Sequence, residues 1–275
     1  GSYGDMKAPT AVHSPMLGMD LFSPQGGTVA LNLNPDFEYG FLPLTGQVNV
    51  QGEIYTPEGL KPYESPRALS LDEIPGVIAD FRQGAENAKR AGFDGVEIHA
   101  AHNYIIAGFL SPYYNQRQDN YGGPLENRAR LLLEVTDAAI EVWGAQRVGV
   151  HLAPRADAHD MGDADRAETF TYVARELGKR GIAFICSRER EADDSIGPLI
   201  KEAFGGPYIV NERFDKASAN AALASGKADA VAFGVPFIAN PDLPARLAAD
   251  APLNEAHPET FYGKGPVGYI DYPRL

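Results

Sequence analysis

The chain has 275 residues, of which 44% are hydrophobic and 22% are charged, and its formal net charge is −13. This composition is typical of a globular domain, and the acidic charge disfavours nucleic acid or an anionic membrane surface as a partner. The sequence contains no run of about 18 apolar residues, so we expect no membrane span. The single cysteine, Cys186, rules out an internal disulfide framework, and we therefore expect a cytoplasmic protein.

The first 65 residues differ in character from the rest of the chain, because they are rich in glycine and proline. They contain one clear strand candidate, "GTVALNLN" at 27–34. The segment "GEIYTPEGLKPY" at 52–63 predicts a hairpin or an extended loop, because Pro57, Gly59 and Pro62 favour turns.

From residue 66 onward, short apolar runs alternate with amphipathic ones. The periodicity predicts helices at 71–92, 123–144, 167–181, 195–206, 217–228 and 240–250, and strands at 95–101, 147–154, 182–187, 208–212 and 229–234. Nearly continuous apolar strands indicate a parallel sheet that is covered by crossover helices.

The fold class predicted from this alternation is α/β, of the (β/α)8 TIM-barrel type. No Gly-x-Gly-x-x-Gly follows a strand, which favours a barrel over an open dinucleotide-binding sheet. With 27–34 we count six of the eight strands and expect the first two to be lacking in this chain. We expect one domain over 1–275, with a divergent part at 1–65 and a regular barrel portion at 66–275.

The segment "GVEIHAAHNYIIAGFLSP" at 95–112 carries the main candidate site. His99 and His102 lie at the carboxyl end of a predicted barrel strand, where such barrels place their active sites, and Tyr104 follows them. Two imidazole N–H groups can polarise a carbonyl oxygen, and a nearby phenol can deliver a proton. The alternative is a pair of core or capping histidines beside a packed tyrosine.

Four segments together resemble the Old Yellow Enzyme family of flavin-dependent ene-reductases. They are "AGFDGVEIHAAHNYIIAGFLSPYYNQRQDNYGGPLENRARLLLEV", "GKRGIAF", "ADAVAFGVPFIANPDLPARL" and "FYGKGPVGYIDYPRL". The resemblance covers about residues 40–275. It implies a (β/α)8 barrel that holds FMN, is reduced by NAD(P)H, and passes hydride to the β-carbon of an activated alkene.

The same resemblance implies roles for individual residues. His99 and His102 would bind the oxygen of a ketone or nitro group, Tyr104 would donate a proton to the α-carbon, and Tyr269 would line the substrate pocket.

The implied flavin contacts depart from the family pattern at several positions. Asn32 stands in place of a glutamine at the flavin pyrimidine edge, and His151 stands in place of an arginine that faces the flavin. Val235 replaces an arginine on the FMN phosphate, although backbone N–H groups near Gly234 can still approach a phosphate. Losing a bidentate arginine contact costs about 1.5–3 kcal/mol.

Other polar segments have less specific interpretations. The loop "RADAHDMGDAD" at 155–165 matches no known metal spacing, so we expect a solvated loop and no metal. The charged run "SREREADD" at 187–194 predicts a mobile loop, and Asn211 and Glu212 either contact a ligand or cap a helix. A loop-pinning ion network is expected from Arg117, Asp119, Glu126 and Arg128.

Three functional hypotheses follow from these observations. The first is an FMN-dependent ene-reductase that acts on a small activated alkene or carbonyl compound. The second is a flavin-free isomerase, cyclase or lyase that uses the same polar residues for carbonyl-polarised proton transfer. The third is a non-catalytic subunit. Open barrel edges would leave backbone groups unpaired, so we expect an oligomer, formed by this chain alone or with a second chain that completes the barrel.

Overall fold

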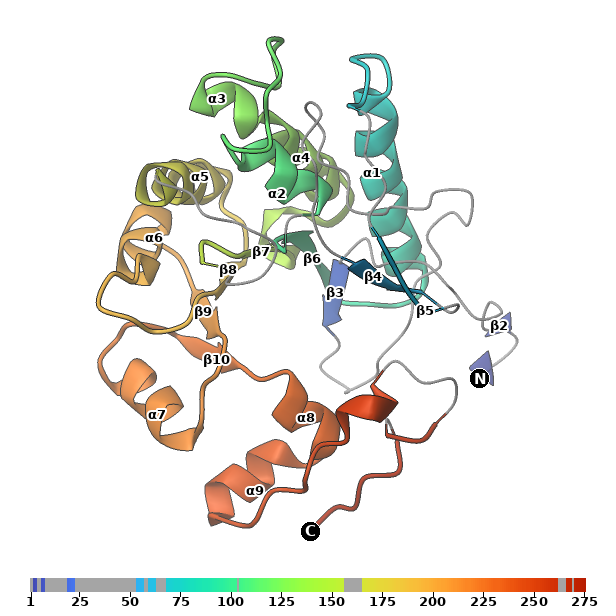
Figure 1. Ribbon diagram of the computed structural model, residues 1–275, viewed down its shortest axis with the longest axis vertical. Coiled ribbons are helices and arrows are strands. Elements are labelled where there is room, and N and C mark those ends of the chain that lie inside the picture. Colours follow the sequence, from blue (N-terminus) through green and yellow to red (C-terminus); the bar gives the residue numbers. More distant parts are fainter. Residues whose placement is uncertain are drawn as a thin grey trace. The chain divides into compact units, whose positions relative to one another are not determined.

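In a computed structural model of the chain, the described residues are 68–275, without Asn103, 156–164, 262–265 and Tyr269, together with five short strands before residue 63. The chain divides into two compact units, Gly1–Tyr208 and Ile209–Leu275 (Figure 1). The strand expected at 27–34 lies outside the described residues. The single domain expected over 1–275 stays a prediction.

The first unit contains three parallel strands in chain order, β6 (Gly95–Ala100), β7 (Val148–Leu152) and β8 (Phe184–Arg188). Their register pairs apolar residues with one another, as in Ile98 with Val150 and Val150 with Ile185, and all of these are fully buried. The intervening residues point to the opposite face, because side chains alternate along a strand. That second face carries His99 and His151.

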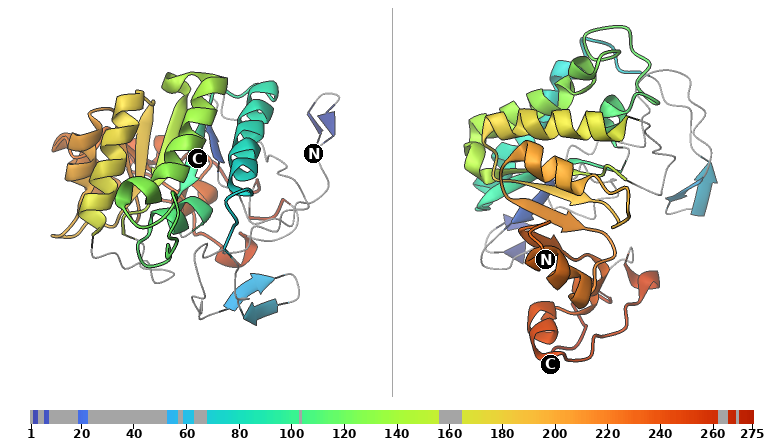
Figure 2. Two further views of the ribbon diagram at one scale, coloured as in Figure 1. Left: turned by 90° about the horizontal axis from the view of Figure 1, so that it is seen from above. Right: turned by 90° about the vertical axis from the view of Figure 1, so that its left-hand side faces the viewer.

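The amphipathic segments of the first unit form the helices that the sequence predicted. They are α1 (Ile74–Arg90), α4 (Arg130–Trp143), α5 (Arg166–Arg180) and α6 (Gly197–Phe204). Helices α1 and α4 pack side by side, as do α5 and α6 (Figures 1 and 2). Within the described part of the chain, no helix is both long and apolar enough to cross a membrane.

The helix expected at 123–144 begins later and is interrupted. Pro124 has an extended backbone, so the short helix α3 starts at the next residue and spans Leu125–Arg128. Ala129 then separates α3 from α4, although its backbone angles stay in the helical region.

Two antiparallel hairpins are described in the N-terminal part, one from β1 (Ser2–Tyr3) and β2 (Met6–Lys7) and one from β4 (Glu53–Thr56) and β5 (Gly59–Pro62). Of the two forms expected at 52–63, a hairpin or an extended loop, the second pair shows the hairpin. Strand β3 (Met19–Phe22) pairs antiparallel with β6, which the sequence did not predict. This pairing satisfies backbone groups along the edge of β6 that would otherwise be open.

The strand–helix alternation continues across the boundary of the two units, because β9 (Tyr208–Asn211) begins at the last residue of the first unit and its other residues belong to the second. Strand β10 (Ala230–Ala232) is parallel to β9. The helices of the second unit are α7 (Lys216–Ala224), α8 (Val235–Ala239), α9 (Leu243–Ala249) and a 3₁₀ turn, η2 (Pro258–Thr260). The parallel pairs in both units confirm the parallel strand–helix pattern.

The close packing of α5 on α6 generates a stability prediction. A Cβ atom on Gly178 would lie 2.4 Å from the backbone oxygen of Phe204. Because a backbone atom cannot move aside cheaply, we expect Gly178→Ala to lower the free energy of unfolding by about 1–3 kcal/mol. Urea unfolding followed by circular dichroism measures this change.

The matched control is Gly76→Ala in α1, where a Cβ atom would meet nothing within 4 Å. Alanine favours helix relative to glycine, so this variant should be more stable by about 0.5–1 kcal/mol. Equal effects of the two substitutions would contradict the close contact between α5 and α6.

Candidate functional site

The candidate site is built on the segment that connects strand β6 to helix α2 (Ile105–Leu110). His99 is near the carboxyl end of β6, and Tyr104 is the residue before the first turn of α2, whose six residues are all buried. His102 lies between them in a left-handed conformation, with a φ of 56°. The strand, the turn and the buried helix together fix the three side chains near one another.

The two histidines of this segment form a hydrogen-bonded pair. Nδ1 of His102 lies 3.0 Å from Nε2 of His99, and the two rings are nearly parallel, with centroids 5.0 Å apart. The ring of Tyr104 has its centroid 5.3 Å from that of His99 and 6.2 Å from that of His102. The structure therefore brings His99, His102 and Tyr104 into one cluster.

A third imidazole joins the cluster from the neighbouring strand. His151 of β7 is the register partner of His99, and its side chain is 9% exposed. Its ring centroid lies 5.1 Å from that of His99 and 5.9 Å from that of His102, edge-on to both. The sequence pattern did not predict this contact, since His151 was expected to face a flavin.

The same face of the sheet carries two further buried side chains with ionisable groups. Glu97 lies two positions before His99 on β6 and is 3% exposed, and Cys186 of β8 is the register partner of His151 and is 6% exposed. Among the described residues, no group of three or more histidine, cysteine, aspartate or glutamate residues is arranged to hold a metal ion.

Only some of the residues expected to contact the cofactor or the substrate lie in the part of the chain that the structure describes. Asn32 and the pocket residue Tyr269 lie outside the described residues. Gly234 and Val235 lie in the second unit, where β10 ends and α8 begins.

The residues at the start of α8 permit a close approach by a ligand. No atom lies within 4 Å of the position that a Cβ atom on Gly234 would occupy, so the backbone there is open. Val235 is 48% exposed and brings no charge, and Pro236 brings no N–H donor to the first turn of α8.

The end of β9 has an unusual backbone. Glu212 and Arg213 have φ values of 102° and 58°, in the region that favours glycine, and their side chains pair at 3.3 Å. The side chain of Asn211 donates to the backbone oxygen of Ala232 at 2.8 Å. Neither Asn211 nor Glu212 caps a helix, because Asp215 and Ser218 form the capping box of α7.

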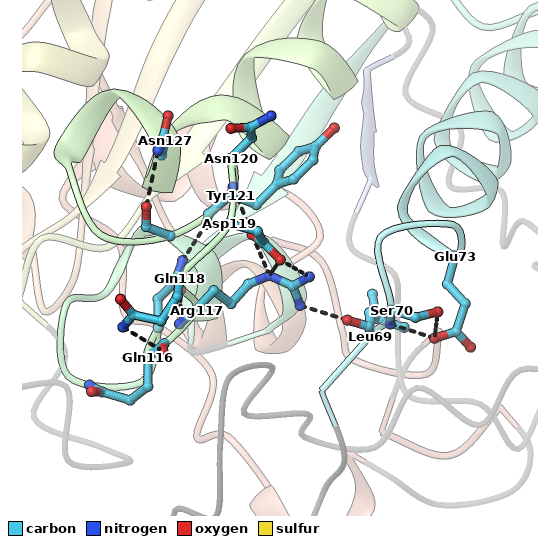
Figure 3. Close-up of polar contacts among 12 residues, drawn as sticks. Leu69, Ser70, Glu73, Gln116, Arg117, Gln118, Asp119, Asn120, Tyr121 and Asn127 are labelled. Carbon is cyan, nitrogen blue, oxygen red and sulfur yellow. Dashed lines mark hydrogen bonds and ion pairs between the residues drawn. The ribbon is translucent and has the colours of Figure 1, made fainter.

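The loop after α2 is held by a buried arginine, as Figure 3 shows. Nη2 of Arg117 lies 2.6 Å from a carboxylate oxygen of Asp119, and Nη1 donates to the backbone oxygen of Leu69 at 2.6 Å. Asp119 also accepts the N–H of Tyr121 at 3.0 Å. Two members of the predicted network, Arg117 and Asp119, therefore form an ion pair.

Arg128 also forms hydrogen bonds in this region, but with backbone oxygens and not with a carboxylate. Its guanidinium donates to the backbone oxygen of Leu110, at the end of α2, at 3.0 Å and to that of Gly123 at 2.8 Å. Backbone carbonyls thus take the place of the carboxylate partner that was expected, and the arginine ties α2 to the loop before α3.

The charged run at 187–194 leaves the end of β8 as a largely exposed loop, and two of its carboxylates have defined partners. Glu189 is 6% exposed and accepts the backbone N–H groups of Ile196 and Gly197 at 3.0 and 2.8 Å, which caps α6. Asp194 pairs with Arg155 and Arg166, each at 2.5 Å, and these guanidinium groups lower the pKa of Asp194 to about 2.

Comparisons with known proteins give a consistent result. A model of the NADH:flavin oxidoreductase / NADH oxidase family matches residues 43–254. The 12-oxophytodienoate reductase 2 of Arabidopsis thaliana is 44% identical over 223 residues, which are 78% of this chain and 59% of that protein. The 12-oxophytodienoate reductase 1 of Oryza sativa subsp. japonica is 43% identical over 224 residues and is covered to the same 59%. The chain thus spans less than two thirds of these relatives.

Solved structures agree with the sequence matches. The structure of morphinone reductase in complex with tetrahydroNAD matches with a TM-score of 0.79 at 44% identity, over 85% of this chain and 66% of that one. The old yellow enzyme homologue from Zymomonas mobilis matches with a TM-score of 0.81 at 41% identity, over 85% of this chain and 68% of that one.

The Arg117–Asp119 pair generates a prediction about stability and pH. The hydrogen bond from Arg117 lowers the pKa of Asp119 below its usual value of 3.8, so the pair stabilises the fold above that value and loses its effect as the pH falls through the lowered pKa. We expect Asp119→Asn to lower the free energy of unfolding by about 1–3 kcal/mol at neutral pH, and by less in acid. Urea titrations at both pH values measure the difference.

The control for this prediction is Asp250→Asn. Asp250 pairs with Lys216 at 2.5 Å, but its side chain is 81% exposed, so the change should be at most about 1 kcal/mol. If Asp119→Asn lowers the free energy of unfolding by no more than Asp250→Asn does, Asp119 does not hold the loop through Arg117.

Proposed function

Because this chain belongs to the NADH:flavin oxidoreductase / NADH oxidase family, we propose that it acts as an FMN-dependent ene-reductase of the Old Yellow Enzyme type. Its membership confirms the family resemblance of the sequence, and the structural matches confirm the barrel class of the fold. The proposed reductant is NADH or NADPH, and the proposed substrate is a small alkene activated by a carbonyl or nitro group. The proposed location is the cytoplasm.

The observation that carries the proposal is the cluster of His99, His102 and Tyr104 at the carboxyl end of β6. Two imidazoles in hydrogen-bond contact lie beside a phenol, with ring centroids 5.3 and 6.2 Å from it. Barrels of this kind place their active sites at this end of the strands. The cluster therefore offers an oxygen-binding pair and a proton donor in one place.

The proposed mechanism assigns one task to each group. N–H groups of His99 and His102 bind the oxygen of the activating group and stabilise the negative charge that develops there. Tyr104 delivers a proton to the α-carbon. Asn32, His151, Gly234 and Val235 would hold FMN, which would supply the hydride for the β-carbon when bound and reduced.

The residues proposed to hold FMN are Asn32, His151, Gly234 and Val235, and Tyr269 is proposed to line the substrate pocket. Support for His151 comes from its burial beside the histidine pair. Support for Gly234 comes from its open backbone.

A second candidate function is flavin-free, carbonyl-polarised proton transfer by the same His99, His102 and Tyr104. The uncharged Val235 favours it, because no arginine stands there to bind a phosphate. A non-catalytic subunit role is the third candidate, and the buried polar cluster argues against it.

Flavin loading is the experiment that tests the proposal. The purified chain is incubated with excess FMN, free flavin is removed, and the absorption spectrum and the reduction of 2-cyclohexenone by NADPH or NADH are measured. We expect retained flavin and turnover. Replacing the proton donor by Tyr104→Phe should lower kcat by about 10²–10⁴-fold, because a positioned acid contributes a factor of that size.

The control is Tyr113→Phe, which removes the hydroxyl group of a residue that is 53% exposed and that the proposal does not use. It should leave flavin retention and kcat unchanged. Failure to retain FMN together with no turnover would reject the reductase and favour the flavin-free alternative.

We also propose that the chain forms an oligomer, alone or with a second chain. Among the described strands, β10 pairs with β9 on one side and lies at the end of the strand order, so its other side is an edge. An edge of this kind tends to pair with further backbone. Light scattering should therefore give a mass above the 29.6 kDa of one chain. A monomer at all concentrations would contradict this.

A further inference from the structure

The side chain of Asn254 joins two segments of the second unit that are far apart in the sequence. Its Nδ2 donates to the backbone oxygen of Ala239, the last residue of α8, and to that of Pro273, each at 2.8 Å. A side-chain amide has two N–H donors, so one serves each segment. The tail, which we define as residues 270–275, is thereby tied to α8.

Hydrogen bonds, more than apolar burial, hold the tail in place. All of its residues are described, none of them is in a helix or strand, and Leu275 is 67% exposed. Arg246, which is 5% exposed, donates a second hydrogen bond to the oxygen of Pro273 at 2.8 Å. Its partner Asp242 accepts the backbone N–H of Leu275 at 2.7 Å. An exposed segment without regular structure is ordered where its backbone is tied down in this way.

Helix α8 also depends on side chains for its last hydrogen bonds. A helix leaves its final four carbonyl groups without partners inside the helix, and α8 has only five residues. Asn254 supplies a donor to Ala239, and Asn240, which is 1% exposed, donates to the oxygen of Pro236 at 2.8 Å. The backbone N–H of Asn254 donates in turn to Oδ1 of Asn240 at 2.7 Å. Two linked amide side chains therefore fix the end of α8.

The position of α8 determines that of the turn before it, because the backbone oxygen of Gly234 accepts the N–H groups of Phe237 and Ile238 at 2.8 and 3.1 Å. We propose that Asn254 is a positioning residue, which fixes Gly234 through α8 and makes the binding of FMN at this turn depend on the docked tail. The proposal rests on the proposed function, in which Gly234 and Val235 hold FMN. Such coupling is reciprocal, so bound FMN also holds the tail in place.

Hydrogen exchange tests the link between the tail and α8 in the full chain without any flavin. Asn254→Asp keeps the size of the side chain and the backbone N–H, but it places a carboxylate oxygen where an NH₂ group donated to two carbonyl oxygens. We expect the amides of α8 and of Leu275 to exchange about 5–20-fold faster in this variant, since each segment loses a hydrogen bond. Mass spectrometry of peptides that cover the two segments measures the rates.

Flavin binding tests the positioning role. The dissociation constants of FMN and of riboflavin, which lacks the phosphate, are measured for the full chain by the quenching of flavin fluorescence. We expect Asn254→Asp to weaken FMN binding by about 5–20-fold and to leave riboflavin binding unchanged, because the phosphate is the group expected near Gly234. A general loss of packing would weaken the binding of both flavins. In the unsubstituted chain, FMN should slow the exchange of the Leu275 amide.

Arg246→Lys is a second variant that loosens the tail alone. Lysine keeps a positive charge beside Asp242, but a single ammonium group does not replace the fork of a guanidinium that donates to three oxygens, those of Asp242, Pro252 and Pro273. The bond from Asn254 to α8 is retained, so FMN binding should weaken by a smaller factor, about 2–5-fold.

Asn220→Asp is the matched control, because Asn220 is an exposed residue of α7 in the same unit and the variant adds the same charge. It should change neither the exchange rates nor the affinity for either flavin.

The positioning role alone is overturned if the unsubstituted chain binds FMN and Asn254→Asp binds it equally well, weakens riboflavin binding to the same extent, or leaves the exchange of either segment unchanged. If Asn254→Asp does not fold, unchanged FMN binding by Arg246→Lys overturns the role. An unsubstituted chain that binds neither flavin rejects the proposed function and the positioning role together.

Discussion

The register between β6 and β7 is the constraint on which the candidate site depends. It pairs Ile98 with Val150 on the face that packs against the helices, and the alternation of side chains then places His99 beside His151 on the other face. A shift of one residue would turn every side chain of a strand to the opposite face, so the apolar core that stabilises the sheet also fixes the polar cluster. Stability and site geometry therefore have the same physical origin in this region.

The elements of the fold were predictable where the signal is local. Apolar periodicity is enough to indicate α1 and α5, and the position of His99 and His102 at the carboxyl end of an apolar strand is enough to indicate a candidate site. The contact between His99 and His151 was not predictable, because it depends on a register between residues 52 positions apart. The antiparallel partner of β6 was missed for a similar reason, since edge pairing depends on which segment lies nearby and not on its own pattern.

The charged residues show a second limit of sequence patterns. The run at 187–194 resembles a solvated loop by composition, yet Glu189 is buried because two backbone N–H groups at the start of α6 need acceptors. Arg117 is likewise buried because a carboxylate and a backbone carbonyl surround its guanidinium group. In both cases the side chain lies where it can form hydrogen bonds with backbone or charged groups of the loops. Its hydropathy alone would have assigned it to the surface.

Helix α2 has a consequence for how this site can change. Tyr104 precedes a helix whose residues, including Phe109 and Leu110, are all buried, so the phenol is carried by the packed core and not by a surface loop. Loops that follow other strands can vary in length and sequence without moving that hydroxyl group. The architecture thus separates two properties that natural variation can alter independently: the length and sequence of the loops, and the placement of the Tyr104 side chain, which belongs to the core.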